Sequence, residues 1–97
     1  MTPNQQRFAD LYRKNLHLAV KERPDEYRHI VGNVDNVADK MIEAVKRGTY
    51  NKDGFAFRRT CKELGLKHTY AAINSYWKGL DNVQADQAAA AGSQEPV

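Results

Sequence analysis

The stretch from residue 57 to residue 77 reads FRRTCKELGLKHTYAAINSYW. Apolar residues recur in it every three or four positions on both sides of Gly65, which is the spacing of two amphipathic helices. Glycine ends a helix readily because it adopts the left-handed backbone conformation without steric cost. The pattern therefore predicts one helix over residues 54–64 and a second from residue 68 or 69 to about 78. The inner stripe expected for the second helix is Ile73, Tyr76, Trp77 and Leu80.

A clear start signal predicts the first helix of the chain. Thr2 and Gln5 have the spacing of a capping box, in which two side chains satisfy the free amides of a helix start, and Pro3 suits the first helical position. The helix should run to about residue 22, because Pro24 disfavours helical backbone in the residue before it.

Boundary residues also place the remaining helices. A short helix is expected over residues 24–31, and a longer one over residues 34–47 with Gly48 as its left-handed cap. Asp53 is the expected N-cap of the helix over residues 54–64, because its carboxylate can accept hydrogen bonds from free backbone amides.

These elements predict an all-α fold, a small bundle of about five helices. A chain of 97 residues has room for one core, and no segment shows the alternation of a strand. Residues 1–80 are expected to form a single helical domain. Residues 81–97 are acidic and rich in alanine, with almost no large apolar residues, and they predict a flexible tail.

Charge is unevenly distributed along the chain. Residues 1–45 hold seven Lys/Arg and seven Asp/Glu, whereas residues 46–80 hold eight basic residues against two acidic ones. Residues 81–97 hold three acidic residues and no basic one. A neutral part, a basic part and an acidic end are typical of a protein that binds a polyanion through its basic part.

The basic part also contains a motif. Cys61 is small enough to permit a close helix crossing, Gly65 suits the turn, Leu66 can plug the core beneath it, and Ile73 can lock the second helix. With these residues, the segment 57–79 resembles the helix-turn-helix superfamily of DNA-binding proteins.

This resemblance implies that residues 54–79 dock on duplex DNA with the second helix in the major groove. Asn74 would pair with an adenine edge, and Ala71 would touch a thymine methyl group. The expected base contacts are Lys67, His68, Thr69, Ala71, Asn74, Ser75 and Lys78. The expected phosphate contacts, which set position and not sequence, are Lys46, Arg47, Lys52, Arg58, Arg59 and Lys62.

Such proteins usually bind two half-sites, so the resemblance also implies a homodimer and a role as a small regulator of transcription or an accessory protein. The small size and the Gln-, Asn- and Ala-rich ends are similar to those of phage or plasmid proteins. A second hypothesis stays open, in which a helical interaction module or inhibitor docks its basic face on an acidic protein. Tyr50 and Phe55 are the aromatic residues expected to be exposed for such contacts.

No pattern indicates catalysis, so we expect no enzyme, no cofactor and no small-molecule substrate. The three histidines lie on separate expected elements without the spacing of a metal site, and Cys61 is expected to be a small buried residue. The chain lacks both a signal-peptide core and an apolar run of membrane-spanning length. We therefore expect a cytoplasmic protein that does not enter membranes.

Overall fold

The computed structural model describes residues 1–79, and all the regular secondary structure in that range is helical. The all-α expectation is therefore confirmed, whereas the tail expected over 81–97 and the inner position of Leu80 lie outside the described residues. The helices are α1 (Pro3–Glu22), α2 (Pro24–Tyr27), the 3-10 turn η1 (Arg28–Ile30), α3 (Val34–Arg47), α4 (Phe55–Leu64) and α5 (Tyr70–Lys78).

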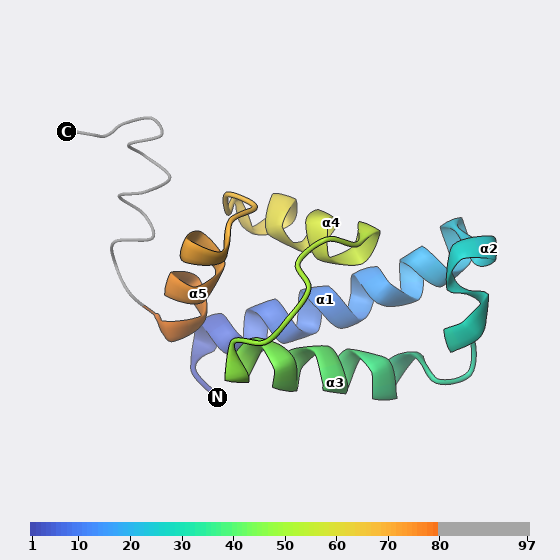
Figure 1. The fold of residues 1–97 in the computed structure, drawn as a ribbon, viewed down its shortest axis with the longest axis horizontal. Coiled ribbons are helices and arrows are strands. Elements are labelled where there is room, and N and C mark those ends of the chain that lie inside the picture. The colour runs from blue at the N-terminus through green and yellow to red at the C-terminus, as the bar shows by residue number, and fades with distance from the viewer. Residues whose placement is uncertain (80–97) are drawn as a thin grey trace.

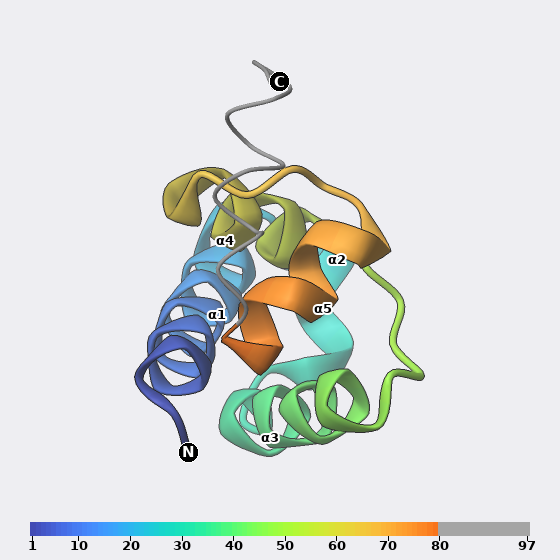
Figure 2. The same ribbon diagram turned by 90° about the vertical axis from the view of Figure 1, so that its left-hand side faces the viewer.

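Helix α1 is the centre of the bundle. It lies between α3 and α4, and α5 crosses the end of the molecule where α1 begins and α3 ends (Figure 1). The end-on view places α5 between α1, α3 and α4 (Figure 2). Helices α4 and α5 both pack mainly against α1 rather than against each other. The last helix of the described chain is therefore held in place mainly by the first one.

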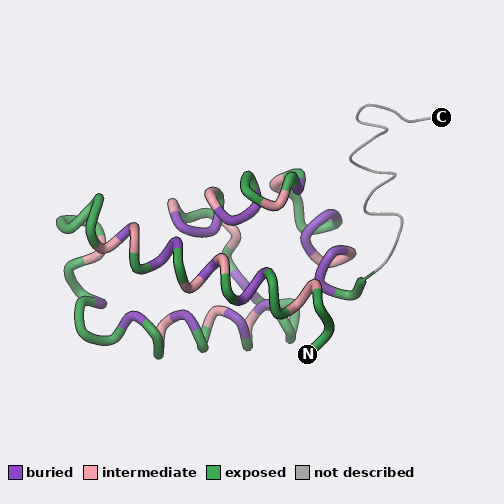
Figure 3. Tube along the Cα trace, turned by 180° about the vertical axis from the view of Figure 1, so that it is seen from behind, coloured by how far each residue is buried: buried purple, intermediate pink, exposed green. Residues whose placement is uncertain are grey.

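Aromatic side chains fill the core where α1, α4 and α5 meet. Phe8 packs edge-on against Phe57, with ring centroids 5.5 Å apart, and against Trp77 at 5.9 Å. All three are buried, as is Ile73, and the buried stripes of the helices face inward (Figure 3). Removing a side chain of this size from water contributes about 1.5–3 kcal/mol, so the burial of Trp77 in this cluster stabilises the packing of α5 on α1.

One polar pair lies inside the α1–α4 interface. The Asn15 amide Nδ2 donates hydrogen bonds of 3.0 Å to Thr60 Oγ1 and to Glu63 Oε1. Asn15 and Thr60 are both fully buried, and Asn15 Oδ1 has no partner among the described residues. Because a buried polar group is costly unless it is bonded, this pair favours one register of α4 on α1.

The helix boundaries agree with the sequence predictions at most positions. Thr2 and Gln5 form the predicted capping box, and Gly48, Gly65 and Gly79 end their helices with positive φ. The prediction for Asp53 was wrong, because Gly54 is the N-cap of α4 and no side chain caps that helix. The Asp53 carboxylate instead pairs with Lys52 and Arg58.

Candidate nucleic-acid interface

Helix α5 is held at both of its ends. Thr69 caps the start, where its hydroxyl oxygen accepts a hydrogen bond from the Ala72 amide. At the other end, the side-chain amides of Asn4 and Gln5 donate 3.0 Å hydrogen bonds to the carbonyls of Tyr76 and Trp77. The last carbonyls of a helix have no partner within it, so α1 adds two side-chain donors to the backbone cap that the Gly79 amide provides.

Tyr50, in the connection between α3 and α4, orders the middle of α5. Its hydroxyl donates a 2.6 Å hydrogen bond to Asn74 Oδ1, and its backbone carbonyl accepts a 3.3 Å bond from the Tyr70 hydroxyl. Its ring stacks on Phe57 at 5.6 Å. The expectation that Tyr50 is exposed was wrong, because this packing leaves only 7% of the residue accessible. Burial raises the pKa of Tyr50 to about 12.

The expected base contacts differ in how freely they can reach a ligand. Lys67, Ala71 and Lys78 are exposed, and Ser75 is half-buried. Thr69 is exposed but its hydroxyl is engaged in capping, and a ring nitrogen of His68 is hydrogen-bonded to the Lys52 carbonyl. Asn74 is half-buried with its oxygen held by Tyr50.

The expected phosphate contacts lie in separate places. Lys46 and Arg47, in the last turn of α3, line a small hollow together with Asn74 and Lys78 of α5. Arg58, Arg59 and Lys62 instead lie along α4 and line a different hollow with Phe55 and Glu63.

The α4 cations are partly neutralised by acidic neighbours. Arg59 Nη1 lies 3.2 Å from Glu22, and its Nε lies 3.8 Å from Glu63. Arg58 lies 3.5 Å from Asp53. In the described residues no such ion pair involves Lys62, and it remains the freest cation of α4.

The cations around α5 have fewer acidic neighbours than those of α4. Residues 44–52 and 64–79 contain no Asp or Glu. We call the cations contributed by these two segments the α5 face, and they are Lys46, Arg47, Lys52, Lys67 and Lys78. Within residues 1–79 only Lys52 among them forms an ion pair, with Asp53 at 3.6 Å. One of the five cations of the α5 face is therefore paired, against two of the three cations on α4.

Tyr70 was not among the aromatic residues expected to be exposed. This first residue of α5 is 48% exposed, and the Lys52 ammonium lies 5.2 Å from its ring centroid. Phe55, expected to be exposed, is half-buried, and the Arg23 guanidinium covers its ring at 4.3 Å.

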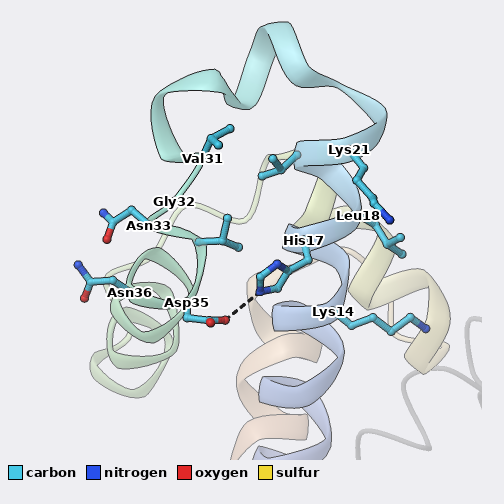
Figure 4. Close-up of a pocket in the computed structure, with 11 residues that line it drawn as sticks. Lys14, His17, Leu18, Lys21, Val31, Gly32, Asn33, Asp35 and Asn36 are labelled. Carbon is cyan, nitrogen blue, oxygen red and sulfur yellow. Dashed lines mark hydrogen bonds and ion pairs between the residues drawn. The ribbon is translucent and has the colours of Figure 1, made fainter.

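A larger hollow lies at the other end of the molecule, between α1 and the start of α3 (Figure 4). Its main polar contact joins His17 Nε2 to the Asp35 carboxylate at 2.9 Å. The hydrogen bonds from His17 and from Arg13 hold the pKa of Asp35 below its usual range. These groups tie α1 to α3 at the surface.

Among residues 1–79, no three His, Cys, Asp or Glu side chains gather as metal ligands. Cys61 is buried as expected, and burial raises its thiol pKa to about 11. None of the helices described has the length and apolar composition needed to cross a bilayer.

The geometry thus singles out the α5 face, with Asn74 and Tyr70, as the candidate site. Comparison with protein-family models, with curated proteins and with solved structures finds no match to this chain.

Proposed function

We propose that this protein binds duplex DNA, with α5 directed into the major groove and the α5 face against the phosphate backbone. The observation that carries the proposal is the position of cations at both ends of α5: Lys46, Arg47 and Lys78 line one hollow beside its last turns, and Lys52 lies 5.2 Å from the ring of Tyr70 at its start. The segments 44–52 and 64–79 that contribute these cations hold no acidic residue. Lys and Arg that neutralise phosphates supply most of the affinity in non-specific binding to DNA and much of it in specific binding.

The dimensions of α5 agree with this role. Nine residues rise roughly 14 Å along the helix axis, and the major groove, about 12 Å wide, admits an α-helix. The outward residues Ala71, Ser75 and Lys78 are small or basic, so they allow close approach to the base edges. Lys67 and Tyr70 stand at the leading end of the helix, where recognition helices commonly contact bases.

The connection between α4 and α5 is longer than in the commonest form of the helix-turn-helix, so the variant that we propose has a longer turn. Five residues, from Gly65 to Thr69, connect the two helices, whereas the usual turn has three or four. The helices are also held mainly by α1. We therefore assign the reading unit to α5 with its supports from α1 and from Tyr50, instead of to residues 54–79 alone.

A regulator or accessory protein of this size reads few bases with one short helix, so useful specificity requires two copies on related half-sites. We accordingly propose a homodimer on DNA.

The test is a fluorescence-anisotropy titration of the full chain against random duplex, single-stranded DNA and duplex RNA at about 150 mM salt. We expect preferential retention of duplex DNA, and selection from a randomised pool should enrich a two-fold-related sequence. Lys67→Ala and Ala71→Gln should alter the enriched sequence. Failure to bind any nucleic acid would reject the proposal and favour the alternative, an interaction module that docks the α5 face on an acidic protein.

A further inference from the structure

The hollow between the end of α3 and α5 has an unusual polar lining. The side chains that line it and carry polar groups are Lys46, Arg47, Asn74 and Lys78, with Val45, Gly48 and Trp77 completing the wall. In the part of the chain that the structure describes, none of the three cations forms an ion pair, and all three are exposed. Within residues 1–79 the hollow therefore carries three cations that no ion pair neutralises.

Asn74 completes this lining as a donor. An asparagine amide has one acceptor group and one donor group. The acceptor, Oδ1, is engaged by the Tyr50 hydroxyl at 2.6 Å, whereas Nδ2 has no partner within residues 1–79. Because Tyr50 is itself buried and stacked on Phe57, this orientation is maintained by the core. Asn74 thus presents its NH2 group to a ligand while its oxygen faces the protein.

We infer that this hollow is a binding site for one phosphate group. Its ligand class follows from the lining, since three cations and an amide NH2 offer donors to a compact oxyanion. Lys46, Arg47 and Lys78 also lie in the last turns of helices, where the partial negative charge is roughly half a unit per helix. Two helix ends offset about one of the three positive charges, and a net positive site remains.

This inference rests on the proposed function and deepens it, because the phosphate would be one of the DNA backbone. It changes the expected role of Asn74 from reading adenine to fixing the position of α5 on the backbone. Adenine reading needs both Oδ1 and Nδ2 turned toward the base, whereas the Tyr50 hydroxyl takes one of the two acceptor positions of Oδ1 and holds that oxygen toward the protein. Tyr50 is accordingly a positioning residue.

Asn74→Asp is the sharpest test variant. It keeps the size of the side chain and the oxygen that accepts the Tyr50 bond, but it replaces the NH2 donor with a negatively charged oxygen. Lys78→Ala removes one cation from the exposed surface without touching the core. Lys62→Ala is the matched control, because Lys62 is also an exposed cation in the last turn of a helix but lies outside the hollow.

The direct measurement is a titration of the full chain with inorganic phosphate, in which 1H–15N NMR spectra are recorded at each phosphate concentration. We expect saturable shifts of the Asn74 side-chain amide and the Gly48 backbone amide in the parent chain, and loss of the Gly48 shift in Asn74→Asp and in Lys78→Ala. Amides around Lys62 should shift only in proportion to ionic strength. The inference is overturned if the Asn74 amide responds to phosphate no more than the amides around Lys62.

Duplex binding supplies the second measurement. Asn74→Asp and Lys78→Ala should weaken binding to all duplexes alike and lower the slope of log affinity against log salt by about one, with the selected sequence unchanged. If Asn74→Asp alters the selected sequence instead, Asn74 reads a base and the phosphate site is wrong. Phosphate binding without duplex binding would support the site for small phosphates while rejecting the proposed function.

Discussion

Gln5 connects the first turn of α1 to the last turn of α5. The side-chain oxygen of Gln5 accepts a 3.2 Å hydrogen bond from the Thr2 backbone amide, and the Gln5 backbone amide donates to Thr2 Oγ1. The side-chain Nε2 of Gln5 donates to the Trp77 carbonyl. A capping box alone would tolerate Glu as well as Gln. The contact with Trp77 requires a donor, so it distinguishes the two residues.

Gln5→Glu is therefore expected to be more destabilising than Gln5→Ala. The glutamate keeps the cap of α1 but places a carboxylate against the carbonyls at the end of α5, where the helix dipole disfavours negative charge. We expect the free energy of unfolding to fall by about 1–2 kcal/mol for Gln5→Glu. Urea denaturation of both variants measures it. If Gln5→Glu equals the parent in stability, the contact with α5 contributes nothing.

At the level of single residues, the helix caps were predicted from the sequence but the burial of Tyr50 and the orientation of Asn74 were not. The Thr2 cap and the Gly48 stop depend on neighbours a few positions away, so the sequence pattern was sufficient for them. The burial of Tyr50 depends on Phe57 and Tyr70, and the orientation of the Asn74 amide depends in turn on Tyr50. Residues that meet only in the folded chain leave no local pattern, and the candidate site was therefore predicted less well than the helices.

Among the elements, α4 and α5 were placed correctly from the apolar spacing, but their mutual packing was not. The helix-turn-helix resemblance implies a pair of helices locked on each other, whereas both contact mainly α1. Helix α1 covers their apolar stripes through Phe8 and Tyr12. Spacing identifies which side of a helix is buried, and it carries no information about which partner buries it.

A peptide of residues 54–79 is accordingly expected not to fold alone. Isolated helices shorter than about 12–15 residues are marginal in water, and α4 and α5 have ten and nine residues. Circular dichroism of the peptide should show little helix and no cooperative melting, whereas the full chain should melt cooperatively. A cooperative transition in the peptide would show that α4 and α5 form an independent unit.

At the scale of the whole molecule, several buried acids favour the protonated form. Burial raises the pKa of Tyr12 and of Tyr50 from 10.0 to about 12, and that of Cys61 from 9.0 to about 11. In each case the folded state binds its proton more tightly than the unfolded state does. Stability from these groups is therefore complete below about pH 9 and is lost as the pH rises toward 12.

Near neutral pH these groups are protonated in both the folded and the unfolded state, so we expect them to add no pH dependence to the free energy of unfolding. Between pH 9 and pH 12 we expect that free energy to fall steeply. One pKa unit corresponds to about 1.4 kcal/mol, so Tyr12, which is 4% exposed, contributes roughly 2–3 kcal/mol of this fall. Denaturation curves across the pH range measure it, with Tyr12→Phe as the comparison. An equally steep fall in Tyr12→Phe would contradict the role of that residue.

The hydrogen bonds from α1 to the end of α5 have a consequence for synthesis of the chain. Asn4 and Tyr76 are separated by 72 residues, as are Gln5 and Trp77, and contacts so distant in sequence form only after the intervening chain is present. A ribosome must therefore release α5 before the first turn of α1 can hold it. Lys78 therefore joins Lys46 and Arg47 around their common hollow only after α5 has left the ribosome and packed against α1.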